Sequence, residues 1–144
     1  MKLRREIRGK VCQRSNSYGQ NGIRLLLIRG KFMIEISKRD WKLFREKIGS
    51  WQETYMERLE VGYIALLESN EPASKKFWEL ERRIREDKRN PGVRITLEKS
   101  EVLWDLIRMV KLDVISISDL EEFSEDLREE VVKRVGVEDV NSAR

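Results

Sequence analysis

The chain has 144 residues, of which 39% are charged and 40% are apolar, and its formal net charge is +4 at pH 7. This length predicts one ordinary domain, and the apolar share suffices for a hydrophobic core. Histidine is absent and the single cysteine is Cys12, which excludes a disulfide framework, the usual zinc sites, and nucleophilic catalysis that needs a histidine.

The N-terminal sequence, MKLRREIRGK, is charged and lacks the apolar segment of a secretion signal. The apolar runs, such as residues 25–28, are too short to span a membrane. We therefore expect a cytoplasmic protein with no membrane partner. Abundant Glu, Lys and Arg, with little Asn and Gln, is a bias of thermophilic proteins.

Period-two alternation of polar and apolar side chains predicts four β-strands. The first strand alternates charged with mostly apolar positions, and a polar loop with Tyr18 at its tip follows it. Gly30 and Lys31 are expected to form the tight turn of a hairpin. The predicted strands are, in chain order, residues 2–12, 23–29, 32–36 and 93–97.

Five amphipathic helices are predicted from apolar spacing and from capping residues. Ser37 caps the first, which Gly49 ends. The motif Ser50-x-x-Glu53 then reads as a capping box for the second helix, which extends to about Glu68. The other predicted helices run from Asn70 to Asn90, over residues 99–112, and from Ser118 to about Val135.

These elements predict an α+β fold in which a small antiparallel sheet of about four strands packs with amphipathic helices. Residues 1–112 are expected to form a domain that binds single-stranded nucleic acid, and residues 113–144 an acidic helical oligomerisation segment with a loose tail. Heptad-like spacing on the last helix predicts a homo-oligomer, dimer or tetramer. The spaced residues are Leu120, Phe123, Leu127, Val131 and Val135.

Charge is distributed unevenly along the chain. Residues 1–50 carry 14 basic and 4 acidic side chains, whereas residues 113–144 carry 4 basic and 10 acidic ones. Such asymmetry favours a polyanion-binding N-terminal region. It is also compatible with an acidic tail that neutralises the basic region, or with the solvated surface of a heat-adapted protein.

Proteins that bind single strands combine a cationic groove for phosphates with aromatic faces for bases. We expect Trp78 and Trp104 to be core residues, and we expect no catalytic residue, metal or cofactor. The residues predicted to contact nucleic acid are Arg5, Arg8, Lys10, Arg14, Tyr18, Arg24, Arg29, Lys31, Phe32, Arg45, Trp51 and Tyr55.

Residues 2–60 resemble the single-stranded DNA-binding proteins of Thermoproteales archaea. The resemblance lies in a basic strand, a polar loop, a hairpin ending in KFMIEIS, and the segment RDWKLFREKI. It implies a helix-and-sheet domain with a hydrophobic cleft beside a basic surface, which binds single strands without strong sequence preference and oligomerises through its C-terminal region. A strand followed by Ser-x-x-Asp-Trp is also similar to transcription coactivators that bind single strands.

The leading hypothesis is therefore a non-enzymatic protein that binds single-stranded DNA or RNA with little sequence preference. One alternative is a protein–protein adaptor or assembly protein with no nucleic-acid role. Another is a nuclease subunit with a metal site formed by carboxylates and lysine, which would need magnesium-dependent cleavage as evidence.

Overall fold

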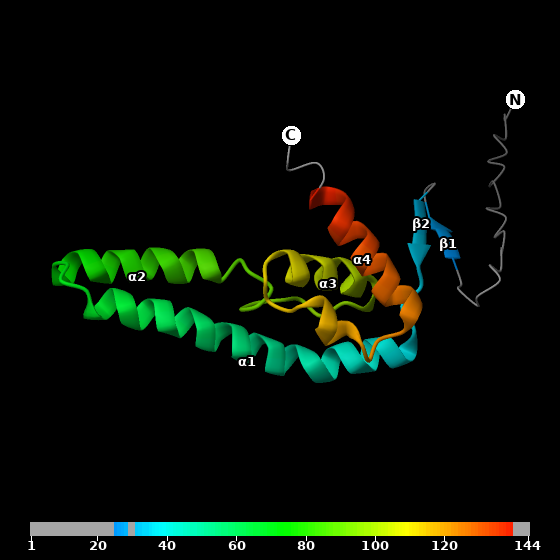
Figure 1. Ribbon diagram of the computed structural model, residues 1–144, viewed down its shortest axis with the longest axis horizontal. Coiled ribbons are helices and arrows are strands. Elements are labelled where there is room, and N and C mark those ends of the chain that lie inside the picture. Colours follow the sequence, from blue (N-terminus) through cyan, green and yellow to red (C-terminus); the bar gives the residue numbers. More distant parts are fainter. Residues whose placement is uncertain (1–24, 29–30, 140–144) are drawn as a thin grey trace, which may run out of the picture. The chain divides into compact units, whose positions relative to one another are not determined.

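The computed structural model describes residues 25–28 and 31–139, and it divides the chain into two compact units, Met1–Glu35 and Ile36–Arg144. The described part is mainly helical (Figure 1). Its elements are β1 (Leu25–Ile28), β2 (Lys31–Ile34), α1 (Lys38–Glu68), α2 (Ala73–Asp87), the 3-10 turn η1 (Lys99–Glu101), α3 (Val102–Lys111), the 3-10 turn η2 (Ile117–Leu120) and α4 (Glu125–Asp139).

In the first unit, β1 and β2 form an antiparallel pair. Its register places Leu25 opposite Ile34 and Ile28 opposite Lys31, so Lys31 belongs to a strand. Two of the segments predicted as strands therefore pair with each other. The predicted first strand, residues 2–12, lies outside the described residues.

The predicted α+β fold with a four-stranded sheet is wrong for the part of the chain that the structure describes, which holds four α-helices and a single two-stranded pair. Residues 93–97, the predicted fourth strand, are irregular. Ile95 lies partly buried against the core and Leu97 is exposed. Alternation of side chains gives a segment one apolar face, but a β-strand also needs a neighbouring strand whose backbone groups form hydrogen bonds with its own.

Helix α1 continues through Gly49, where the sequence predicts its end. The Ser37 cap is confirmed, because its Oγ accepts a hydrogen bond of 2.9 Å from the amide of Asp40. The second predicted cap is wrong, because Ser50 Oγ donates to the carbonyl of Lys47 inside the helix. The apolar face continues beyond this point, and its packing outweighs the cost of about 1 kcal/mol for glycine inside a helix.

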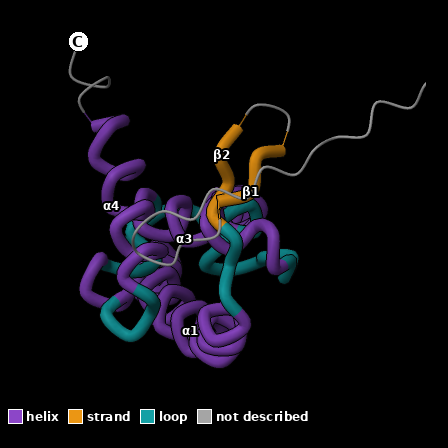
Figure 2. The backbone as a smooth tube through the Cα atoms, turned by 90° about the vertical axis from the view of Figure 1, so that its right-hand side faces the viewer, coloured by secondary structure: helices purple, strands orange, loops and turns teal. Residues whose placement is uncertain are grey.

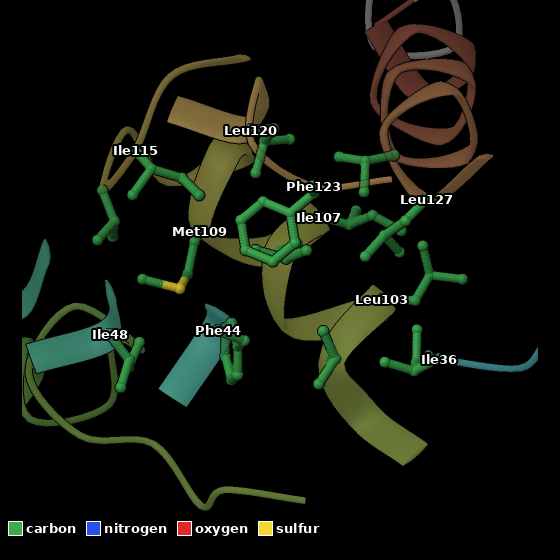
Figure 3. Packing of buried hydrophobic residues seen from close by; sticks show 14 residues of the cluster. Ile36, Phe44, Ile48, Leu103, Ile107, Met109, Ile115, Leu120, Phe123 and Leu127 are labelled. Atoms are coloured by element: carbon green, nitrogen blue, oxygen red, sulfur yellow. The ribbon is translucent and has the colours of Figure 1, made fainter. Parts of the chain in front are cut away.

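The hydrophobic core of the second unit is formed by the first half of α1, by α3, by η2 and by α4. Figure 3 shows Phe44, Met109 and Leu120 converging, and all three are completely buried. Figure 2, viewed nearly along α1, shows α3 and α4 on the same side of that helix. Burying each such side chain stabilises the fold by roughly 1.5–3 kcal/mol. We call this packed region the body.

The apolar residues of the C-terminal segment belong to the body, although they were predicted to contact other subunits. Leu120, Phe123, Leu127 and Val131 are each at most 4% exposed, and Val135 packs partly against them. The predicted single helix is divided into η2 and α4, and the predicted boundary after residue 112 lies inside the second unit.

Asp40 joins the start of α1 to the start of α4. Its buried carboxylate accepts hydrogen bonds from the amide of Ser124 at 2.9 Å and from the Ser124 hydroxyl at 2.7 Å. It also accepts one from the Ser37 hydroxyl at 2.7 Å. Close by, Lys47 Nζ lies 2.6 Å from a carboxylate oxygen of Glu122. These bonds satisfy a carboxylate that would otherwise be costly to bury.

The second half of α1 and α2 form a two-helix arm, defined here as residues 56–88. The two helices lie side by side (Figure 1). Polar contacts join them: the Tyr63 hydroxyl donates to Asp87, and Lys76 Nζ donates to the carbonyl of Leu67 at 2.7 Å. Every residue of the arm is at least partly exposed to solvent. The arm is thus held without a buried core of its own.

None of the helices within the described ranges combines the length and the apolar character needed to cross a membrane.

Candidate functional site

Most of the residues predicted to contact nucleic acid lie outside the described part of the chain. These are Arg5, Arg8, Lys10, Arg14, Tyr18, Arg24 and Arg29. For Lys31 and Phe32 the structure gives the backbone pairing alone: Phe32 lies opposite Leu27 in the hairpin. Arg45, Trp51 and Tyr55 are the three predicted contacts whose side chains are described.

Trp51 is held between aromatic rings of the body. It stacks on Phe123 with ring centroids 6.2 Å apart, and it meets Phe44 edge-on at 6.4 Å. Such pairs contribute about 0.5–1.5 kcal/mol beyond the area they bury. The ring therefore has a structural role, and the residue is half-buried.

Tyr55 packs over the turn that follows α2. Its hydroxyl accepts a hydrogen bond of 2.8 Å from the Asn90 side chain, and a methyl group added at Gly92 would lie 2.4 Å from its ring. The guanidinium of Arg58 lies 5.2 Å from the centre of the ring. Burial, followed by the charge of Asp87, raises the pKa of the phenol above its usual 10. The Tyr55 ring therefore joins α1, at the base of the arm, to the turn that follows α2.

Arg45 belongs to an exposed cationic strip at the beginning of α1, which we call the basic face: Lys38, Lys42 and Arg45. Their spacing of four and three residues places them on one side of the helix, and all three are exposed. Arg45 lies 5.7 Å from the ring centre of Trp41, and Lys42 lies 3.7 Å from Glu46. Among the described residues, these three exposed cations are the best candidates for the predicted contacts with phosphates.

Other basic residues of α1 stabilise the fold instead. Arg39 donates to the carbonyl of Glu122 at 3.2 Å, and Arg58 donates to the carbonyl of Asp113 at 2.7 Å. Asp113 has a positive φ of 54°, and it follows the last turn of α3. Arg58 thus satisfies a carbonyl group left free where that helix ends.

Trp78 is exposed on the arm, so the prediction that it is a core residue is wrong. Its exposed fraction is 66%, and that of its neighbour Phe77 is 63%. Trp104 is exposed too, at 37%, so the same prediction is wrong for this residue. Arg134 lies 4.8 Å from the centre of its ring. The rings of Phe77 and Trp78 meet edge-on with their centroids 5.2 Å apart. No pattern in the sequence distinguishes this exposed pair from the adjacent apolar pair Val102 and Leu103, which is buried.

Two concave surfaces flank these aromatic residues. A groove of about 940 Å³ lies between the helices of the arm, and Gly62, Leu66 and Trp78 are among the residues that line it. A second hollow of about 400 Å³ is lined by Phe77, Leu80 and other residues of α2. By exposed area both surfaces are more apolar than polar.

A polar cleft of about 470 Å³ lies beside α3, lined by Arg94, Thr96, Glu101, Asp105 and Arg108 among others. The side chain of Asp105 is 8% exposed, and its Oδ2 makes no hydrogen bond. Burial raises the pKa of this carboxyl to about 6, against the lowering effect of Arg108. Among the described residues no cluster of acidic or cysteine side chains fits a metal ion.

Comparison with known proteins gives no further constraint: no family model, curated protein or solved structure matches this chain.

Proposed function

We propose that this chain is a non-enzymatic protein that binds single-stranded nucleic acid mainly through its phosphates. The observation that carries the proposal is the charge of the first 50 residues, which hold 14 basic and 4 acidic side chains. Basic N-terminal arms of this kind are typical of nucleic-acid binding. The basic face extends the cationic sequence onto the start of α1.

In this proposal the aromatic contacts are fewer than the sequence suggests. Trp51 and Tyr55 are occupied by packing inside the second unit, so Tyr18 and Phe32 remain the candidates for stacking on bases. Phosphate contacts then supply most of the affinity, and binding is tolerant of sequence because phosphates carry no base identity. Both DNA and RNA single strands fit this mechanism.

The test is fluorescence anisotropy of the full chain with a labelled oligo-dT, compared with a duplex of equal length over a range of salt concentrations. We expect the single strand to bind more tightly, because Tyr18 and Phe32 can stack on unpaired bases, and we expect the phosphate contacts to make the affinity fall steeply as salt rises. Lys42→Ala and Arg45→Ala should each reduce the log–log salt slope by about 0.7, the value for one phosphate contact on a single strand. Lys75→Ala, which removes one exposed charge from the arm, is the matched control.

Absence of binding to any oligonucleotide at low salt would overturn the proposal. It would favour the alternative of an adaptor or assembly protein, which the exposure of Phe77 and Trp78 supports. Equal effects of Lys75→Ala and Lys42→Ala would retain electrostatic binding but remove the basic face as its site.

A further inference from the structure

The polar cleft of about 470 Å³ beside α3 has a buried carboxylate in its lining. The side chain of Asp105 is 8% exposed, and its Oδ2 makes no hydrogen bond within the described part of the chain. Its Oδ1 lies 4.0 Å from a guanidinium nitrogen of Arg108, at the limit of an ion pair. A buried carboxylate oxygen without a donor is costly. The torsion about the Cβ–Cγ bond is broad, so a small rotation presents this oxygen to a ligand that carries an N–H group.

The charged side chains that line the cleft come from two segments of the second unit. Glu101, Asp105 and Arg108 follow one another at spacings of four and three residues, which places them on one side of the helix. Lys88 follows α2, and Arg94 lies in the irregular segment after it. With Glu98, the lining holds three basic and three acidic side chains. The cleft is therefore balanced in charge, and groups of both signs border it.

Two of the basic side chains at the cleft are available to an anion. Lys88 and Arg94 are both exposed, and neither side chain forms an ion pair or a hydrogen bond with another described residue. The arginines of α2, by contrast, are paired with neighbouring glutamates. Guanidinium and ammonium groups form strong, charge-assisted hydrogen bonds with phosphate. The cleft thus combines exposed groups that bind an anion with a buried group that accepts a hydrogen bond.

This combination sets the chemistry of the ligand. Three carboxylates repel a purely anionic ligand, and three basic side chains repel a purely cationic one. A ligand with a neutral N–H donor at one end and an anionic group at the other satisfies both kinds of side chain. A nucleotide has this form, because its base carries the donor and its phosphate carries the charge. The cleft volume of about 470 Å³ also lies within the usual range of ligand pockets, about 300–1,000 Å³.

We propose that this cleft binds one nucleotide of the single strand and prefers a base with an exocyclic amino group, such as cytosine. The amino group donates to Asp105, as cytosine N4 does to acidic side chains elsewhere, and the phosphate lies against Arg94 and Lys88. Half-buried Ile95 supplies an apolar surface for the base. Uracil and thymine carry a carbonyl oxygen in place of the amino group, and the carboxylate repels it. This binding mode rests on the proposed function and adds a preference at one nucleotide to otherwise tolerant binding.

The test compares labelled oligo-dC with oligo-dU of equal length, by fluorescence anisotropy of the full chain. A pH of about 7.5 keeps Asp105 ionised, because burial raises the pKa of this carboxyl only to about 6. The two bases differ at the amino group of cytosine and at the proton on the neighbouring ring nitrogen. We expect oligo-dC to bind about tenfold more tightly, the scale of one good base contact. Oligo-dU tests the proposed function by itself, because it carries phosphates and stackable bases without the amino group.

Variants of Asp105 show whether the preference arises in the cleft. Asp105→Leu has a similar volume but no acceptor, so the ratio of the two affinities should fall from about ten to about one. Asp105→Asn should also lower the ratio, because its amide can donate to uracil as well as accept from cytosine. Glu53→Gln is the matched control, since Glu53 is exposed, lies outside the cleft and loses the same charge. Circular dichroism checks that each variant is folded.

The outcomes separate the cleft from the proposed function. If neither oligonucleotide binds, the proposed function fails and the nucleotide site fails with it. Equal affinities for oligo-dC and oligo-dU overturn the nucleotide site alone, because binding to phosphates remains. A preference for oligo-dC that persists in folded Asp105→Leu and Asp105→Asn also overturns the site, as does a preference that Glu53→Gln abolishes to the same extent.

Discussion

The body and the arm share one helix but use it in opposite ways. In the first half of α1, Phe44 and Ile48 are at most 6% exposed and anchor the core. In the second half, Val61 and Ile64 are more than half exposed. Apolar side chains alone therefore do not locate a core. What differs is that α3 and α4 bury the first half of α1 in the core, whereas no residue in the second half of α1 is buried among the described residues.

The largest expected difference between the two regions is in the cost of removing an aromatic ring. Phe44→Ala should lower the free energy of unfolding by about 3–5 kcal/mol, because it leaves a cavity in the core. Phe77→Ala should change it by at most about 0.5 kcal/mol in the monomer. Urea denaturation at low protein concentration measures both. Similar losses in the two variants would mean that the arm is packed as tightly as the body.

The second expected effect is a pH dependence that originates in the body. Because the pKa of Asp105 is raised from 3.8 to about 6 in the folded state, the folded chain binds this proton more tightly than the unfolded chain does. Its contribution to stability is therefore complete below about pH 4 and is lost as the pH rises to about 6, by roughly 2–3 kcal/mol. Asp105→Asn should remove that loss.

Denaturation of both chains at pH 4, 5, 6 and 7 provides the measurement for Asp105. The difference between wild type and Asp105→Asn isolates this carboxyl from other groups that titrate in the same range. A difference that stays constant across the range would show that Asp105 is not desolvated.

A third effect tests the junction between the regions. Gly92→Ala places a methyl group 2.4 Å from the Tyr55 ring, and such overpacking costs about 1–3 kcal/mol. The ring should shift, and the 2.8 Å hydrogen bond between Tyr55 and Asn90 should weaken. Thermal unfolding measures the cost, and Tyr55→Phe in the same background shows whether the hydrogen bond is already lost. An unchanged melting temperature would contradict the close packing.

The smallest effect concerns glycine on the arm. A methyl group added at Gly62 meets no atom within 4 Å, so Gly62→Ala should stabilise α1 by about 0.5–1 kcal/mol. Gly49→Ala makes the same change at an open position nearer the body. Circular dichroism during thermal unfolding compares them. Destabilisation by Gly62→Ala alone would indicate that the arm needs the groove beside Gly62 to remain open.

The sequence predicted a helix end correctly where neighbouring residues alone determine it. Ser37 caps α1 as expected, because a cap depends on residues three positions away. Gly49 and Ser50 were misleading, since the packing of one continuous apolar face outweighs a single weak position. Residues 93–97 were misleading in another way, because strand formation requires a distant partner that alternation does not reveal.

The candidate site was harder to predict, because the same residue types serve burial and binding. The apolar spacing of Leu120, Leu127 and Val131 was recognised correctly, but a stripe does not specify whether α3 or another subunit covers it. Trp78 was predicted to be a core residue but is exposed. Trp51, a predicted contact for bases, packs against Phe123 while part of its side chain stays exposed. The net charge of the neighbouring sequence did not indicate which tryptophans are buried, because charge-balanced segments occur both in the core and on the arm.

Because α1 is one continuous helix, it sets a fixed distance between its two ends. A helix of 31 residues spans on the order of 45 Å, and the basic face occupies one end while the arm's tip occupies the other. Because the helix has no break at Gly49, the distance between the basic face and the tip of the arm is set by the rise of the helix. A strand bound at the basic face, as proposed, and any partner bound at the tip would therefore be held at a constant separation.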